Sequence, residues 1–415
     1  MFRTYAFTEM PYPYIPPEDT FESARVTLPN RIYDPELGHQ LYGKYFDIYR
    51  RADELGLDVM INEHHATATC VEPAASIPLG IIARETTKAR ILSLGSPIAN
   101  RGQPLRVAEE MAMIDVISQG RLDCGFVRGV PMELSAGNAN PVDTKLRFWE
   151  AADLIVKAWT SHDGPFNWEG DYYHYRQANA WPRVYQEPHP PVWVPTQTPS
   201  SAMEVAERQY VLATILNGAE GASQIFDAYR RRSVECGFGE PAPELLAYCG
   251  LVFVGENDKE GFAGARKLHW YLQHNKVAPQ FMNVPGYIDP RARAAMMRKV
   301  ATEGQSTTIT GHFAHASIEE LVEGGFFFAG SPETVYQQLC SFHEKVGGFG
   351  HLLMMVQGGT MGYELTAGSM ELFAEQVLPR LRSTWDNEPR TAAPAEEDDT
   401  ATAAMESDLE RLTLP

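Results

Sequence analysis

The chain has 415 residues, a formal net charge of −19 and a hydrophobic share of 44%. That share is typical of a globular protein that buries a sizeable core. The negative charge argues against broad binding to nucleic acid or to an anionic membrane surface. A ligand that carries a phosphate must therefore be held by a local cluster of donors and cations. No apolar run in the sequence approaches the length that spans a bilayer.

The cysteines and the N-terminal segment bear on the compartment. Five cysteines, Cys70, Cys124, Cys236, Cys249 and Cys340, form no CxxC pair. Their odd number and unpaired spacing indicate neither a zinc site nor a disulfide framework, which favours a reducing environment. The opening MFRTYAFTEMPYPYIPP is interrupted by prolines and is not typical of a signal peptide. We therefore expect a cytoplasmic protein.

Strand-like and helical segments alternate along the first part of the chain. Strands are predicted at 2–8, 57–61, 89–98 and 121–127. The helices between them are predicted at 41–56, from Pro73 onwards and from Pro104 to 119. Such alternation predicts parallel strands joined by right-handed crossovers.

The alternation continues through the second part of the chain. Further strands are predicted at 190–195, 210–216, 246–254 and 351–356. Helices are predicted at 144–160, from about 200, at 222–235, from 259, at 331–345 and at 369–381, with a hairpin-like insert at 166–176. Eight strand–helix pairs predict an α/β fold, namely a (β/α)8 TIM barrel over residues 1–386.

Two segments depart from this rhythm. The range of about 276–328 carries prolines, glycines and several histidines, and we expect it to be a large insertion near the C-terminal strands that lies over the barrel mouth. Residues 387–415 are rich in Pro, Ala, Glu, Asp and Thr, which predicts a disordered acidic C-terminal tail.

An arginine between small residues marks the end of the fourth predicted strand. In the stretch GRLDCGFVRG the apolar run ends at Arg128, which Gly129 follows. Glycine lets the backbone approach a bound anion closely, and a guanidinium group can grip phosphate with two donors. Because active sites of such barrels lie where strands end, Arg128 is a candidate phosphate ligand. A solvated arginine at an ordinary strand end is the alternative.

Hydroxyl groups cluster at the end of the fifth predicted strand, in the run TQTPSS at 196–201. Hydroxyl groups directly before a helix lie beside free N–H groups and the positive end of the helix dipole. With Arg128 on the neighbouring strand, they predict a phosphate site. An ordinary helix N-cap is the alternative, and it accounts for one hydroxyl better than for three.

The second predicted strand leads into Glu63, His64 and His65. Adjacent residues on an extended backbone point to opposite sides, so the two histidines are poorly placed to ligate one ion. There is no HxH or HExxH spacing, and carboxylates look scarce at the other strand ends. We therefore predict no metal. We expect one histidine to face the pocket as a hydrogen-bond donor or general base, and the other to pack or hydrogen-bond within the wall.

These motifs together resemble the bacterial luciferase-like, flavin-dependent monooxygenase superfamily. The stretches that carry the resemblance are NEHH (62–65), SQGRLDCGFVRG (118–129), the segment 166–208, AGSPETVYQQL (329–339) and ELFAEQVLPRLR (371–382). The resemblance implies a (β/α)8 barrel that uses reduced FMN as a co-substrate. It also implies a separate NAD(P)H-dependent flavin reductase, a homodimer and a small organic substrate.

The resemblance also assigns roles to residues. Arg128 matches the family arginine that contacts the phosphate, and Thr198, Ser200 and Ser201 lie where its phosphate-binding hydroxyl groups fall. Gly95 and Ser96 fall where the family often has a non-proline cis peptide beneath the flavin ring. The predicted cofactor-binding set is thus Gly95, Ser96, Asn100, Arg128, Gly129, Thr198, Ser200 and Ser201. His64 matches a histidine near the reactive edge of the flavin, so it is the catalytic candidate.

The activity implied by the resemblance is oxygenation of the substrate through a flavin 4a-hydroperoxide, with His64 handling a proton. Three alternatives stay open. A deazaflavin-dependent hydride-transfer enzyme would need more cations at the rim than we can assign. A flavin-binding protein without catalysis fits poorly with the retained His64, and a metal-dependent hydrolase on the same fold is the third. The range 276–328 is unlike the family pattern, and it leaves the substrate open.

Overall fold

The computed structural model describes residues 1–134, 136–288 and 316–386, together with the single positions 290, 291, 293, 294, 298 and 313. The predicted tail at 387–415 and the middle of the predicted insertion lie outside the described residues.

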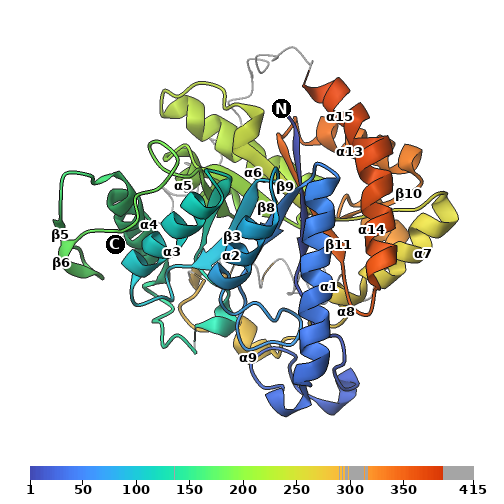
Figure 1. Ribbon diagram of the computed structural model, residues 1–415, viewed down its shortest axis with the longest axis horizontal. Coiled ribbons are helices and arrows are strands. Elements are labelled where there is room, and N and C mark those ends of the chain that lie inside the picture. The colour runs from blue at the N-terminus through green and yellow to red at the C-terminus, as the bar shows by residue number, and fades with distance from the viewer. Residues whose placement is uncertain are drawn as a thin grey trace.

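Among the described residues, nine parallel strands form one sheet that closes into an eight-stranded barrel (Figure 1). The barrel strands are β1 Arg3–Thr8, β2 Asp58–Ile61, β3 Ile91–Pro97, β4 Leu122–Val127, β7 Val192–Pro195, β8 Val211–Ile215, β9 Leu246–Val254 and β11 His351–Gln357. Each pairs with the next in this order, and the pairing of β11 with β1 closes the ring. The predicted (β/α)8 barrel is therefore confirmed, and its eight strands lie close to their predicted ranges.

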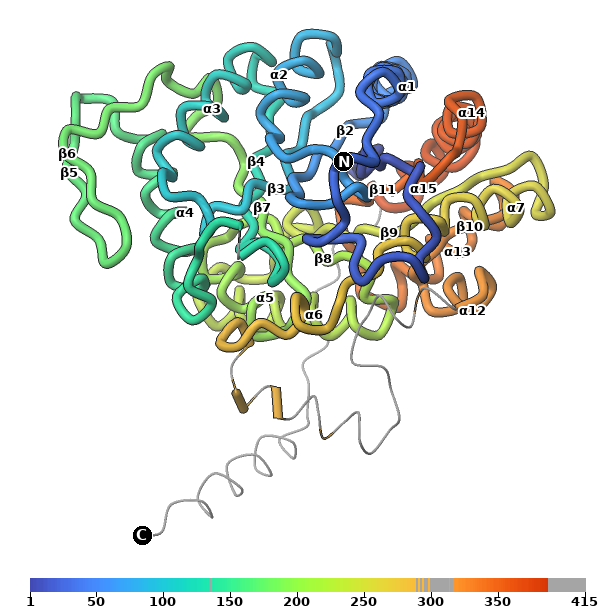
Figure 2. The backbone as a smooth tube through the Cα atoms, turned by 90° about the horizontal axis from the view of Figure 1, so that it is seen from below, coloured from blue at the N-terminus to red at the C-terminus, as the bar shows by residue number. Residues whose placement is uncertain are grey.

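Helices surround the barrel on the outside (Figures 1 and 2). They are α1 Pro35–Glu54, α2 Ser76–Glu85, α3 Pro104–Ile117, α4 Thr144–Thr160, α5 Pro199–Ala206, α6 Gly218–Glu235, α7 Asp258–Leu268, α13 Pro332–Lys345, α14 Tyr363–Leu372 and α15 Leu378–Trp385. Helix α1 begins earlier than predicted because Asp34 caps it, accepting hydrogen bonds from the N–H groups of Glu36 and Leu37. None of the helices in the described part of the chain has both the length and the apolar character needed to cross a membrane.

Several further elements complete the chain. The predicted hairpin is present as β5 Phe166–Glu169 and β6 His174–Ala178. The predicted closing helix is longer and is divided by a π-helical turn, Phe373–Val377. The sequence did not indicate the short helices α8 Trp270–Gln273, α9 Pro279–Met282 and α12 Ile318–Glu323, or the strand β10 Phe327–Gly330. Strand β10 pairs with the second half of β9.

Two apolar cores sandwich the sheet. One lies between strands and helices and includes Ile91, Leu122 and Val194. The other fills the barrel interior and includes Leu92, Trp193 and Leu353. Because both faces of the strands are buried, β3, β9 and β11 are buried along their whole length, as expected for a parallel barrel.

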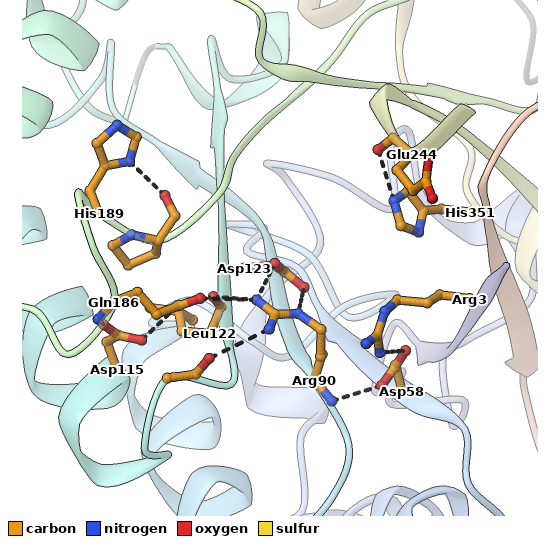
Figure 3. A network of polar contacts seen from close by, with 12 residues as sticks. Arg3, Asp58, Arg90, Asp115, Leu122, Asp123, Gln186, His189, Glu244 and His351 are labelled. Atoms are coloured by element: carbon orange, nitrogen blue, oxygen red, sulfur yellow. Dashed lines mark hydrogen bonds and ion pairs between the residues drawn. The ribbon is translucent and has the colours of Figure 1, made fainter. Parts of the chain in front are cut away.

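Charged side chains tie the strands together where they begin (Figure 3). Arg90 donates to both carboxylate oxygens of Asp123, at 2.8 and 2.6 Å, and Tyr5 Oη donates to Asp123 Oδ2 at 2.9 Å. Arg3 Nη1 donates to Asp58 Oδ2 at 3.0 Å. These residues lie at or beside the first residues of β1 to β4. In parallel barrels, side chains at this N-terminal end contribute to stability and those at the opposite end to activity. The network therefore fixes the strands at the end opposite the predicted site.

His351, the first residue of β11, lies buried in the same region. Its Nε2 is 2.9 Å from the carbonyl oxygen of Glu244, and its ring centroid is 4.8 Å from that of Trp193. Burial lowers the pKa of His351 to about 4. The imidazole is therefore neutral in the folded protein near neutral pH.

This histidine should make stability depend on pH. The unfolded chain takes up the proton near the ordinary pKa of about 6.5, whereas the folded chain does so only near about 4. Between these values the unfolded state binds more protons, so the free energy of unfolding should rise with pH. The contribution of neutral His351 to the free energy of unfolding is fully present above about pH 6.5 and is lost as the pH falls towards 4. It amounts to about 3 kcal/mol at most.

Urea unfolding of the wild type and His351→Gln at several pH values between 4 and 7 checks this expectation. The variant should lose part of the pH dependence in that window, and the exposed His174→Gln should keep all of it. Equal pH dependence in the wild type and His351→Gln would show that His351 does not titrate there.

Candidate functional site

The carboxyl ends of the strands meet at one end of the barrel, where the loops after β1 and β2 lie. This end is at the bottom of Figure 1, and Figure 2 is seen from that side. Parallel barrels build their sites at this end because loops from all eight strands converge there. Each predicted site residue follows or ends one of these strands, so the barrel places all of them at this end.

His64 pairs with a carboxylate that lies beyond the end of β4. Its Nδ1 is 2.8 Å from Oε1 of Glu133, which also accepts from the backbone N–H of His65 at 3.1 Å. Burial alone would raise the pKa of Glu133, but the hydrogen bond and the charge of His64 outweigh it and hold the pKa below its usual value. An ionised carboxylate can only accept, so Nδ1 of His64 carries the proton. Nε2 then has no hydrogen bond to a described residue.

His65 belongs to a separate carboxylate. Its Nε2 is 3.1 Å from Oε1 of Glu63, and this hydrogen bond raises the pKa of His65. Arg101 Nη2 donates to both oxygens of Glu63, at 2.9 and 2.8 Å, and the N–H of Ala75 donates to Oε2. The His65 ring is thus held by a buried carboxylate that also pairs with Arg101.

The expectation that carboxylates are scarce at the other strand ends is wrong for two of them: Glu9 follows β1 and Glu133 lies beyond β4, and each is no more than 5% exposed. Glu63 and Glu72, on the same connection as the two histidines, are buried as well. Glu9 directly follows β1 and accepts from Asn62 Nδ2 at 2.8 Å. Neither oxygen of Glu72 has a hydrogen bond to a described residue, and burial followed by the charge of Glu9 raises the pKa of Glu72 well above its usual value. This environment favours the protonated form of Glu72.

A buried cation from the N-terminal loop also lies here. Arg25 is 3% exposed, and its Nη1 is 3.6 Å from Oε1 of Glu133. Its Nε donates to Oδ1 of Asn275 at 2.9 Å. The charge of Glu133 is therefore shared between His64 and Arg25. No sequence pattern marked Arg25, Glu72 or Glu133 as site residues, because they lie in loops that lack helical or strand periodicity.

Arg128 directly follows β4. Its Nε is buried and has no hydrogen bond to a described residue, and the same holds for Oδ1 of Asn100. Gly129 has a φ of +89°, and a Cβ there would lie 2.5 Å from Nδ2 of Asn100. Glycine is thus required at position 129 for both its backbone conformation and its close packing.

The hydroxyl cluster lies at the start of α5, on the neighbouring strand connection. Thr198 is the N-cap, and its Oγ1 accepts from the N–H of Ser201 at 3.3 Å. The same Oγ1 is 3.2 Å from Oγ of Ser200 and 3.1 Å from Oγ of Ser201. Since β4 pairs with β7, Arg128 and Thr198 follow adjacent strands. The N-cap alternative therefore holds for Thr198, and two further hydroxyl groups lie beside it.

Strand β3 is irregular at the predicted Gly95–Ser96 position. The pairing with β4 shifts between Ser93 and Ser96, and a non-proline cis peptide joins Leu94 to Gly95, one bond before the predicted place. A Cβ on Gly95 would lie 2.5 Å from the carbonyl oxygen of Gly125. Only glycine permits the two strands to approach so closely here.

These groups suit a ligand that carries a phosphate. Arg128 offers a charged donor without a partner, α5 offers hydroxyl groups at the positive end of a helix, and Asn100 offers an unpaired acceptor. A phosphate would pair with the first two, and a hydroxyl group of a sugar-like chain would pair with the third.

Comparison with known proteins gives one family match. The family model described as luciferase-like monooxygenase matches residues 27–347. The chain is 29% identical over 175 residues to the oxygenase component of flavin-dependent trigonelline monooxygenase from Acinetobacter baylyi, covering 41% of this chain and 48% of that protein. It is 20% identical over 341 residues to limonene 1,2-monooxygenase from Rhodococcus erythropolis, covering 80% of each. The match thus spans about half the length of the first of these relatives.

Solved structures share the fold at low identity. A monooxygenase from Streptomyces bottropensis has a TM-score of 0.69 at 22% identity, over 92% of this chain and 100% of that chain. The oxygenating constituent of 3,6-diketocamphane monooxygenase from Pseudomonas putida, in complex with FMN, has 0.66 at 20%, over 92% and 99%. The coenzyme F420 dependent tetrahydromethanopterin reductase from Methanopyrus kandleri has 0.61 at 15%, over 91% and 99%. These likenesses establish the fold alone.

Glu133→Gln should be strongly destabilising, because it leaves the buried Arg25 without its nearby countercharge. Loss of one partner of a buried pair typically costs about 3–5 kcal/mol. Urea unfolding at pH 7 measures the change. The matched control is Glu235→Gln, which breaks an exposed pair with Arg232 and should leave the midpoint unchanged. Wild-type stability in Glu133→Gln would show that Glu133 does not compensate Arg25.

Proposed function

We propose that this chain, which belongs to the luciferase-like monooxygenase family, is the oxygenase component of a monooxygenase that uses reduced FMN and O₂ to oxygenate a small organic substrate. One observation carries the proposal: the buried Nε of Arg128 has no hydrogen bond to any described residue. A buried donor left unpaired is costly, and the α5 hydroxyl groups follow the adjacent strand β7, so the two together support a phosphate as the ligand. The FMN complex of a structural neighbour supports the choice of flavin.

Arg128 and the hydroxyl groups of Thr198, Ser200 and Ser201 would hold the phosphate. Gly129 allows the backbone to come close, and Asn100 would accept from a hydroxyl group of the ribityl chain. When bound, reduced flavin supplies the reaction with O₂, which is chemistry of the cofactor. The protein must hold the substrate, limit water and handle a proton.

His64 is the group placed to handle that proton. Its Nδ1–H donates to Glu133, so Nε2 is the nitrogen that can accept or return a proton. The carboxylate of Glu133 stabilises the imidazolium while the proton resides on His64, and it fixes the orientation of the ring. The proton-handling unit is therefore a histidine positioned by a carboxylate of another strand connection.

Two further expectations follow for partners. The name of the Acinetobacter relative contains the words oxygenase component, which supports a separate reductase that supplies reduced flavin. The names of the relatives mention trigonelline and limonene, which support a small organic substrate. Homodimer formation stays a prediction.

His64→Ala should lower turnover with little change in the affinity for flavin. Loss of a positioned acid–base group typically costs about 10²–10⁴-fold in rate. Turnover and flavin titration of the purified variant measure the two effects separately. His65→Gln is the matched control, because His65 pairs with Glu63 and not with Glu133, so turnover should largely persist. Unchanged turnover in His64→Ala would remove His64 from the mechanism.

Arg128→Ala should weaken FMN binding by about 1.5–3 kcal/mol, the scale of a hydrogen bond to a charged group. Riboflavin, which lacks the phosphate, should bind the variant and the wild type with similar affinity. Fluorescence titration with each flavin measures both. If FMN affinity does not change in Arg128→Ala, the phosphate assignment is wrong.

A further inference from the structure

Residues 275–288, here called the strap, run across the end of the barrel from the N-terminal loop to the end of β4 (Figure 2). Backbone bonding fixes the first end: the N–H of Ala24 donates to the carbonyl oxygen of Lys276 at 2.8 Å. Lys276 Nζ donates to the carbonyl oxygens of Glu18 and Phe21, each at 2.9 Å. The strap is therefore anchored to the loop after β1.

Side chains strengthen the same anchor. Arg25 donates to Oδ1 of Asn275, and the N–H of Ala278 donates to Oγ of Ser23 at 3.1 Å. Beyond this point the strap includes α9, which contacts the 3₁₀ turn Pro131–Glu133 after β4. It thus joins the loop after β1 to the loop after β4.

Tyr287 fixes the other end of the strap on Arg128. Its Oη donates to the carbonyl oxygen of Gly129 at 2.7 Å, and its own carbonyl oxygen accepts from Arg128 Nη2 at 2.9 Å. The Arg128 guanidinium lies over the Tyr287 ring, 3.7 Å from its centroid. Gly286, with a φ of +85°, provides the turn before it. Three contacts therefore join Tyr287 to Arg128 and Gly129.

These contacts restrict what Arg128 can do. The Tyr287 carbonyl accepts the hydrogen bond that Nη2 of Arg128 donates, and the Tyr287 ring packs against the guanidinium group and restricts its orientation. Nε is left buried and without a partner. A guanidinium group held in one orientation loses little rotational freedom when it binds an anion, so more of the interaction energy appears as affinity.

We propose that Tyr287 is a positioning residue that orients Arg128 for the phosphate, so that the strap makes the site favour phosphorylated flavins over unphosphorylated ones. This inference rests on the proposed function, since it concerns the same phosphate site. Tyr287 itself contacts Arg128 and Gly129 and acts through them.

Titration of purified Tyr287→Ala and Tyr287→Phe with FMN and with riboflavin tests the proposal. Loss of the ring removes a cation–π contact, so Tyr287→Ala should bind FMN about five- to thirtyfold more weakly than the wild type. Riboflavin affinity should stay within about twofold, because riboflavin has no phosphate. Tyr287→Phe keeps the ring and should retain most of the FMN affinity. Tyr287→Leu, which keeps the bulk but not the aromatic face, should behave like Tyr287→Ala.

The outcomes separate this inference from the proposed function. Wild-type FMN affinity in Tyr287→Ala or Tyr287→Leu, with weak binding in Arg128→Ala, would overturn the role of Tyr287 and leave the phosphate site intact. Wild-type FMN affinity in Arg128→Ala would overturn both. Equal weakening of FMN and riboflavin in the Tyr287 variants would also overturn it, because Tyr287 would then act on the flavin ring or on the fold.

Discussion

Closure of the parallel sheet is the constraint on which the rest of the structure depends. Pairing of β1 with β11, and of β9 with both β8 and β11, completes a ring from segments separated by most of the chain. The ring fixes where every strand ends, and it thereby gathers Glu9, His64, Arg128 and Thr198 at one end although they lie far apart in sequence. Ion pairs such as that of Arg90 with Asp123 stabilise the opposite end of the barrel, where the strands begin.

The site end is built from buried charge, which is costly unless it is paired. Glu63 is compensated by Arg101 and His65, and Glu133 by His64 and Arg25. Burial raises the pKa of Glu72 and so favours its protonated form. Arg128 has no carboxylate partner among the described residues: the Tyr287 carbonyl satisfies Nη2, and its buried Nε has no hydrogen bond to any of them. A buried cationic donor without a countercharge supports an anionic partner.

Much of the barrel could be predicted from sequence, because parallel strands buried on both faces appear as short apolar runs between amphipathic helices. The strand-end rule then selected His64, Arg128 and the α5 hydroxyl groups as candidates, and the structure places them at one end of the barrel. Glu133 and Arg25 could not be found in this way, because each reaches the site from an irregular loop whose course depends on tertiary packing. Glu9 could have been predicted as a site residue, because it directly follows the first predicted strand. Tyr287 lies in the range expected to be an insertion, and its contact with Arg128 depends on the course of the strap.

The central claim is that this end of the barrel holds reduced FMN and lets it react with oxygen. Anaerobic titration of the protein with reduced FMN, beside a parallel titration with a reduced deazaflavin coenzyme, tests it most directly, followed by mixing with oxygenated buffer. We expect saturable binding of reduced FMN and consumption of oxygen after mixing. Saturable binding of the deazaflavin coenzyme without binding of FMN would contradict the proposed function and favour hydride transfer on the same fold.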